Sequence, residues 1–417
     1  MWYTIDRTLE SVIKMKSLKE LFLYGPGPSS SHTIGPQRAA EIFKNQVKDA
    51  SSFFVILYGS LALTGKGHLT DVILKKVLGE NTTIIFDTNL QNLVHPNTMA
   101  FLAFDKNNQL IAKKTCYSLG GGAISFENET YLESKEVYPF NSFNEMNLYL
   151  KKLNFKSYDE LVTYYEDKDI QNYLQFCLNK MFECVENGLK ATGLIPGKLK
   201  LERVAKQIFE NAQNASLDEQ KKLYITAFAY AVAENNASGL NVITAPTCGS
   251  AGVLAAVLYY EYFFHQQSLE KLTKALMVAG LIGNLVKTMA SISGAIGGCQ
   301  AEIGTATSMA AAALCTLYDL SNQQIEYASE LAMEHMLGLT CDPVLGYVQI
   351  PCIERNAIAA LRVYDAFLYA KVISHSRKNR ISLDDVIKAM KITGDELSFD
   401  YKETSQGGLA KIHDIKK

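Results

Sequence analysis

The sequence predicts an α+β fold with two domains, a mixed α+β domain over residues 15–155 and a mostly helical domain over 165–412. Two observations lead to this prediction. Short β-branched and aromatic runs between turn residues, which are typical of strands, lie in the first third of the chain. From about residue 157 onward, apolar residues instead recur at helical spacing with few breakers. The polar stretch 141–160 separates the two patterns and marks the boundary.

The elements of the first part can be placed in order. A helix is expected over 37–43, directly after a proline. Strands are expected at 53–58, 83–86 and 109–112, where apolar β-formers are bounded by turn residues. The glycine-rich segment 117–123 joins two further strand candidates.

In the second part, helices are expected over 161–184 and 223–233. The stretches 250–264 and 272–291 are apolar on most faces and rich in small residues, which favours the middle of a helix bundle. Their apolar runs are interrupted before about 18 residues, so we interpret them as buried helices and not as membrane spans.

The composition argues against several classes of protein. A formal net charge of −2 gives no reason to expect nucleic acid or an anionic membrane as a partner. Eight cysteines in 417 residues are too sparse for a disulfide scaffold and fit a reducing compartment, so we expect a cytoplasmic protein. The first residues lack the basic and apolar regions of a signal peptide.

A hydroxyl-rich turn, Pro28–Pro36, opens the first predicted helix. Consecutive hydroxyls and free backbone N–H groups at a helix start can bind a carboxylate. The candidate carboxylate-binding residues are Ser29, Ser30, Ser31 and Thr33. His32, in the same turn, would be placed for proton transfer. The alternative is an elaborate helix N-cap with an exposed histidine.

Three other polar segments carry weaker signals. His95 lies alone in a turn with Pro96 and Asn97. The segment 117–122 is either a flexible anion-binding loop or a tight connection, since glycines serve both. The loop 244–252 follows a short strand-like segment, 240–243, and is equally an anion site or a connection between buried helices.

Three cysteines near the C-terminal end carry the strongest chemical signal. Cys299 follows a Ser- and Gly-rich segment, Cys341 precedes Asp-Pro, and Cys352 follows a proline. The gaps of 41 and 10 residues between them are unlike those of zinc knuckles or bacterial ferredoxins, so separate elements must bring them together. Three thiolates without a fourth partner suit a metal or cluster with one open position, which a Lewis-acid catalyst needs. For each cysteine alone, the alternative is a core thiol.

Because these motifs follow one another in this order along the chain, it resembles the iron–sulfur-dependent L-serine dehydratases in their single-chain form. The resemblance covers about residues 15–410. It rests on segments 28–36, 95–97, 117–122, 245–247, 293–304, 334–343, 351–357, 402–405 and 407–410.

This resemblance implies that the first part is the family's beta domain and the helical remainder its alpha domain. It implies that Cys299, Cys341 and Cys352 hold a 4Fe–4S cluster whose fourth iron is open to substrate. The implied reaction converts L-serine to pyruvate and ammonia without pyridoxal phosphate, the open iron binding the serine hydroxyl as a Lewis acid.

Such a reaction needs a base for the α-proton and a group that holds the substrate carboxylate, and the residues offer candidates for both. His32 and His95 are candidates for proton transfer, with acid and base unassigned. The hydroxyl-rich turn would bind the substrate carboxylate, with Arg355 or Lys402 as counter-charge. The expected partner is L-serine, with no nucleic acid and no membrane, and a homodimer is left open.

Two alternatives stay open at this point. One is a related cluster-dependent dehydratase acting on threonine or another hydroxy-amino acid, because one methyl group separates the two substrates. The other is a non-catalytic amino-acid or iron–sulfur sensor. The end of the chain carries no cysteine, so we expect water or a small anion at the open iron at rest.

Overall fold

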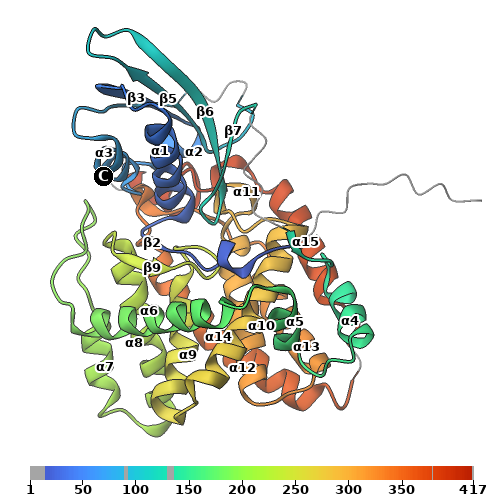
Figure 1. Ribbon diagram of the computed structural model, residues 1–417. Helices are drawn as coiled ribbons and strands as arrows, with labels where there is room; N and C mark the ends of the chain where they lie inside the picture. Colours follow the sequence, from blue (N-terminus) through green and yellow to red (C-terminus); the bar gives the residue numbers. More distant parts are fainter. Residues whose placement is uncertain (1–14, 89–92, 129–135, 378, 416–417) are drawn as a thin grey trace, which may run out of the picture.

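A computed structural model describes residues 15–88, 93–128, 136–377 and 379–415 (Figure 1). The α+β fold predicted from the sequence is confirmed, because a five-stranded sheet formed near the N-terminus is followed by a large group of helices. In Figure 1 the sheet lies at one end of the molecule and the helices fill the other. The exact domain limits stay a prediction.

The sheet has the strand order β4-β3-β5-β6-β7, in which β3 and β4 are parallel and the other neighbours are antiparallel. The strands are β3 (Ser52–Tyr58), β4 (Thr83–Asp87), β5 (Thr98–Phe104), β6 (Leu110–Gly120) and β7 (Ala123–Phe126). The strands expected at 53–58, 83–86 and 109–112 are therefore confirmed, the last as the start of the long β6.

Three helices, α1 (Gly35–Gln46), α2 (Ser60–Thr64) and α3 (Thr70–Leu78), lie on the side of the sheet that faces the helical part (Figure 1). Small residues on α1, such as Ala39 and Ala40, let Phe43 pack against Val55 and Phe101 of the strands. The sheet thus has its own apolar core, and α1 and α2 present their first turns to the rest of the molecule.

The remaining helices follow the sheet, and most of them contribute to the second, larger core. They are α4 (Phe143–Lys152), α5 (Tyr158–Tyr165), α6 (Ile170–Lys190), α7 (Ala205–Ala212), α8 (Leu217–Ala237), α9 (Ala251–His265), α10 (Leu269–Met289), α11 (Gly294–Gly297), α12 (Thr305–Leu317), α13 (Asn322–Glu334), α14 (Cys352–Ile373), α15 (Leu383–Glu396) and α16 (Gly408–Ile415). The helices α9, α10 and α12 are buried on most faces, as their small-residue-rich sequences indicate.

Of the described helices, α10 alone is long and apolar enough to cross a membrane by length and composition. Because 78% of its most apolar window is buried inside the protein, α10 agrees with the buried helix predicted over 272–291.

The single helix predicted over 161–184 is wrong, because the structure divides it into α5 and α6. The backbone becomes extended at Glu166. The Glu166 carboxylate accepts hydrogen bonds from Ser17 Oγ at 2.7 Å, Leu18 N at 2.7 Å and Tyr138 Oη at 2.9 Å. These contacts anchor the N-terminal segment, and they account for a break that local helical spacing does not reveal.

Two small strand pairs connect the N-terminal segment with the helices. They are β1 (Met15–Lys16) with β8 (Glu136–Tyr138), and β2 (Tyr24–Pro26) with β9 (Asn241–Ile243). The strand predicted at 240–243 is therefore confirmed as β9. Just after β2, Gly27 N donates to Leu240 O at 3.0 Å and Asn236 Nδ2 donates to Pro28 O at 2.9 Å. The hydroxyl-rich turn consequently begins against the helical part and ends in α1.

Candidate active site

The hydroxyl-rich turn is buried and wound as a helical turn, Ser30–Ile34, that continues into α1. Ser29 caps this turn, since its Oγ accepts a hydrogen bond from His32 N at 3.2 Å. Ser118 Oγ donates to Ser31 O at 2.7 Å, which ties the turn to β6. The N-cap interpretation is thus correct for Ser29, but His32 has no exposed surface, so the alternative of an exposed histidine is wrong.

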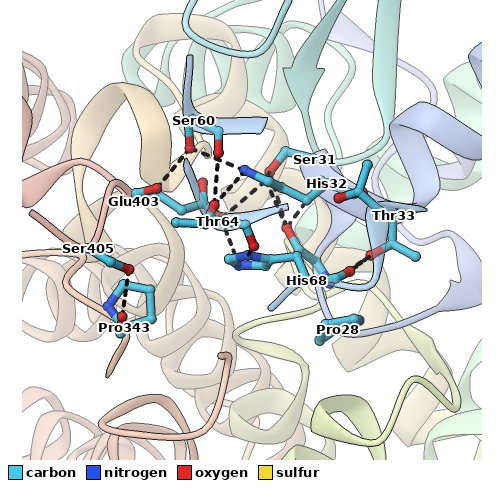
Figure 2. Close-up of polar contacts among 12 residues, drawn as sticks. Pro28, Ser31, His32, Thr33, Ser60, Thr64, His68, Pro343, Glu403 and Ser405 are labelled. Atoms are coloured by element: carbon cyan, nitrogen blue, oxygen red, sulfur yellow. Dashed lines mark hydrogen bonds and ion pairs between the residues drawn. The ribbon is translucent and has the colours of Figure 1, made fainter. Parts of the chain in front are cut away.

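Both ring nitrogens of His32 contact hydroxyl groups (Figure 2). Nε2 lies 3.1 Å from Ser60 Oγ and 3.0 Å from Thr64 Oγ1, both on α2. Nδ1 lies 3.1 Å from Ser31 Oγ and 3.4 Å from Glu403 Oε1. His32 is therefore held in one orientation by the turn that carries it, by α2 and by the C-terminal segment.

His68 and Glu403 complete this group, and the sequence analysis identified neither of them. The His68 ring stacks on His32 with 4.4 Å between ring centroids, and its Nε2 lies 3.4 Å from Glu403 Oε1. His68 Nδ1 lies 2.9 Å from Thr64 O. Because a carbonyl only accepts, Nδ1 carries the proton, and Nε2 of the neutral ring presents a lone pair. Figure 2 shows the two rings and the carboxylate facing one another.

Local signals for these two residues exist, although they are weak. His68 lies in a glycine-bearing turn with Gly65 and Gly67, and the following Leu69 has a φ of +58°. Glu403 itself has a φ of +59°, in the left-handed region that non-glycine residues rarely occupy. Such backbone conformations cluster at functional sites, but φ is visible only once the structure is known.

Burial determines the protonation of this group. Removal from water lowers the pKa of His68 to about 4 and lowers the pKa of His32 well below its usual value, with the neighbouring His68 adding to the effect on His32. Both rings are therefore neutral near pH 7. Burial raises the pKa of Glu403 well above its usual value, and the nearby Glu302 carboxylate raises it further.

The three cysteines come from separate elements and line one cavity together with Glu302 and Glu403. Cys299 follows α11 after one residue, Gly298, Cys341 forms an isolated bridge with Lys402, and Cys352 begins α14. Cys299 and Cys341 are buried and Cys352 is half-buried. Burial raises the pKa of Cys341 and of Cys352, and a charge on Cys299 would raise both further. A charge on Cys352 would also raise the pKa of Cys341, so the thiols lie close enough to interact electrostatically.

Hydrogen bonds hold the cysteine turns in place. Gln300, next to Cys299, donates from Nε2 to Met390 O at 3.1 Å and accepts from Gly338 N at 2.9 Å. Asn356, one turn after Cys352, donates to Gly249 O at 2.8 Å, which brings the 244–252 loop to the cavity. Each cysteine therefore lies on a turn that is anchored to a second element.

The residues present fit a thiolate-bound cluster. A Cβ placed on Gly294 would lie 3.2 Å from Cys341 Sγ and 2.9 Å from Glu302 Oε2, so only glycine leaves this space free. Three cysteine thiols are the donor set that iron–sulfur clusters use. A second possible metal-binding group consists of His32, His68 and Glu403, whose ligand atoms lie within 4.8 Å of one another.

Not every residue predicted for the site lies at this cavity. Ser29 lines it, whereas the hydroxyls of Ser31 and Thr33 contact His32 and the His68 carbonyl. Ser30 is buried in the turn. Arg355 hydrogen-bonds to Cys299 and donates to Thr340 O at 2.9 Å.

Two predicted residues lie apart from the histidine pair. His95 lines a neighbouring cavity, where its Nδ1 accepts a hydrogen bond from Asn97 N at 3.0 Å. Asn97 O in turn accepts from Ser118 N at 2.9 Å, and Pro96 O accepts from Ser60 N at 2.8 Å, so the turn that carries His95 is linked to the hydroxyl-rich turn through β6 and through α2. Lys402 extends away from the cavity, and its Nζ lies 3.4 Å from Asp395 O.

Comparison with known proteins gives two family matches and a set of relatives. The family described as serine dehydratase alpha chain matches residues 69–410, and the family described as serine dehydratase beta chain matches residues 17–80. L-serine dehydratase 1 of Escherichia coli K12 is 36% identical over 95% of this chain and 99% of its own length. An L-serine dehydratase of Helicobacter pylori strain 26695 is 39% identical, over 95% and 98% of the two chains. One of Streptomyces coelicolor is 37% identical over 94% and 98%.

Proposed function

Because this chain belongs to the serine dehydratase family, we propose that it converts L-serine to pyruvate and ammonia. The observation that carries this proposal is the meeting of two chemically different groups at one cavity. Three cysteine thiols line it together with Glu403, and the Glu403 carboxylate contacts the buried pair His32 and His68. Serine elimination requires both a group that removes the α-proton and a group that assists departure of the hydroxyl.

We assign the thiol side of the cavity to the cofactor. Cys299, Cys341 and Cys352 would hold a 4Fe–4S cluster, and the hydrogen bond from Arg355 to Cys299 would stabilise the charge of a bound thiolate. When bound, such a cluster supplies an iron with an open coordination position, a Lewis acid for the β-hydroxyl.

We assign removal of the α-proton to His68. Its ring is neutral near pH 7, and it lines the same cavity as the cysteines. Among the described residues, the polar contact of its Nε2 is with the Glu403 carboxyl group. His32 stacks on this ring and contacts the same carboxylate oxygen, so it positions both partners. After proton transfer, the new positive charge on His68 would lie 3.4 Å from Glu403 Oε1, which favours the charged ring.

The substrate carboxylate would bind at Ser29, the one hydroxyl residue of the turn that lines the cavity. The other hydroxyls of the turn then have a supporting role, because Ser31 and Thr33 hold the two histidine segments in place. Lys402 has no part in this assignment, since its ammonium lies beside Asp395 O.

Anaerobic purification, cluster reconstitution, and iron and sulfide analysis, followed by a pyruvate assay on L-serine, test the proposal. The expected result is four iron and about four sulfide per chain together with pyruvate formation. L-threonine serves as the comparison substrate, since its extra methyl group is worth about 1–3 kcal/mol of discrimination. A fully loaded protein that forms no pyruvate would contradict the proposed activity.

A further inference from the structure

The two oxygens of the Glu403 carboxylate have different surroundings. Its Oε1 faces His32 and His68, each at 3.4 Å. Its Oε2 is buried and has no hydrogen-bond partner among the residues that the structure describes. Burial and the Glu302 carboxylate raise the pKa of Glu403, and the nearby Ser29 hydroxyl and Ala295 backbone act in the opposite direction, but neither of these two gives Oε2 a hydrogen bond of ordinary geometry. A buried carboxylate oxygen without a donor is costly unless a ligand supplies one.

The cavity that Glu403 lines is poor in positive charge. Its two ionisable carboxyl groups are Glu302 and Glu403, and no lysine or arginine is among its lining residues. The nearest cation, Arg355, is engaged with Thr340 O and Cys299. An amino-acid substrate would bring an ammonium group into this space, and a buried ammonium must meet a carboxylate. The positive charge of that ammonium would favour the ionised form of Glu403, whose pKa burial otherwise raises.

Glu403 is better placed for this task than Glu302. Burial raises the pKa of Glu302 to about 7, but the hydrogen bond from Thr247 and the nearby Arg355 guanidinium act in the opposite direction, so this carboxyl group already has partners. Glu403 Oε2 has no such contacts, and the oxygen on the same carboxyl group already contacts the base His68. An ammonium on Oε2 would bring the α-carbon, one bond away, close to His68 Nε2.

The backbone around Glu403 is built to hold the side chain in the cavity. Its left-handed conformation, at φ +59°, is unfavourable for a residue with a Cβ. Two hydrogen bonds stabilise it, because Glu403 N donates to Cys341 O at 2.9 Å and Ser60 Oγ donates to Glu403 O at 2.8 Å. Strain that is retained in this way at a site is typical of a residue with a direct role.

We propose that Glu403 Oε2 binds the α-ammonium group of the substrate and thereby makes the site selective for amino acids over the corresponding acids that lack nitrogen. This inference rests on the proposed function, since it names the group that recognises one part of that substrate. It assigns the three polar parts of serine to different surfaces: the ammonium to Glu403, the carboxylate to Ser29, and the hydroxyl to the side of the cavity that carries the cysteines.

The test compares L-serine with 3-hydroxypropionate, which keeps the carboxylate and the β-hydroxyl but has no ammonium. In reconstituted protein, Glu403→Gln should raise KM for L-serine at least about tenfold, because a buried charge loses its partner. The inhibition constant of 3-hydroxypropionate should change by less than about threefold, since that ligand makes no such pair. The matched control is Glu302→Gln, the other carboxylate of the cavity, which should leave the preference for serine over 3-hydroxypropionate in place.

Three outcomes would overturn the inference. If Glu403→Gln weakens both ligands equally, or lowers kcat alone, Glu403 only positions the histidines. If Glu302→Gln produces the selective loss instead, the ammonium binds there. Should Glu403→Gln fail to fold, Glu403→Asp keeps the charge and is expected to retain the preference for serine, and its loss would contradict the assignment.

Failure of the proposed function is distinguishable from failure of this inference. If the wild-type protein forms no pyruvate, calorimetric titration with L-serine and with 3-hydroxypropionate still measures the two affinities. Tighter binding of serine in the wild type and its selective loss in Glu403→Gln would support the ammonium site without any turnover. Equal binding of both compounds to the wild type would reject it.

Discussion

The two sides of the cavity differ in how they are assembled. On the thiol side, Cys299, Cys341 and Cys352 lie on turns of the helical part and share a space that Gly294 keeps open. On the histidine side, His32 and His68 come from the N-terminal part, and their ring nitrogens already have partners in Ser60, Thr64 or Glu403. One side is an incomplete donor set, whereas the other is a group of side chains that already hydrogen-bond to one another.

Because of this difference, substitutions on the thiol side and on the histidine side should have separate effects on cofactor content and activity. Loss of a thiol should remove the cofactor and with it the activity, while loss of a histidine should leave the cofactor in place. Glu403 joins the sides, because its N–H bonds to Cys341 O while its carboxylate faces both rings. The following predictions separate the two sides, beginning with the largest expected effect.

Cys341→Ala should abolish activity and lower bound iron and sulfide to near background, because two thiolates do not retain the cluster. Cys315→Ala is the matched control, a fully buried thiol inside α12 that lies outside the cavity. The control should keep its iron and lose only about 1 kcal/mol of stability. Full iron content in Cys341→Ala would show that the cluster assignment is wrong.

His68→Gln and His32→Gln should keep full iron content and an unchanged visible spectrum, while kcat falls by about 10²- to 10⁴-fold. The physical reason is that His68 carries the lone pair and His32 fixes its ring. Steady-state pyruvate assays together with iron analysis check this. If His95→Gln instead produces the larger loss, proton transfer belongs to the neighbouring cavity.

The free energy of unfolding should fall as the pH is lowered from about 6.5 to about 4. Burial lowers the pKa of His68 to about 4, so in this window the unfolded chain binds a proton that the folded chain does not. The contribution is present in full above about pH 6.5 and is lost as the pH approaches the folded pKa, on the order of 3 kcal/mol in total.

Denaturant unfolding of His68→Gln at several pH values measures this contribution. The variant should show a shallower dependence on pH than the wild type. His265→Gln, at the exposed end of α9, is the control and should leave the wild-type slope unchanged. Parallel curves for the wild type and His68→Gln would mean that His68 does not remain neutral when folded.

The smallest effect is expected at Lys402, the neighbour of Glu403. Because the Lys402 ammonium lies beside Asp395 O, Lys402→Ala should change KM for L-serine by less than about twofold. A tenfold increase in KM would show that Lys402 is a counter-charge for the substrate carboxylate.

Much of the fold could be predicted because its signals are local. The strands at 53–58 and 83–86 and the buried helices near 250–264 and 272–291 appear where β-branched runs and small-residue-rich apolar runs indicate them. The break between α5 and α6 could not be predicted, since hydrogen bonds from Ser17, Leu18 and Tyr138 hold the Glu166 carboxylate where the helix ends. Those partners are distant in sequence, so periodicity carries no trace of them.

By itself, the sequence determined the α+β order of the chain, its family resemblance and the residue types of the thiol side, because cysteines on Gly- and Pro-marked turns are conspicuous. His68 and Glu403 could be identified as site residues only from the tertiary structure. A histidine becomes a base, and a carboxylate a ligand for a cation, through burial and through the groups that face them. Those conditions arise here because Ser60, Cys341 and Glu403, far apart along the chain, are brought into contact by folding.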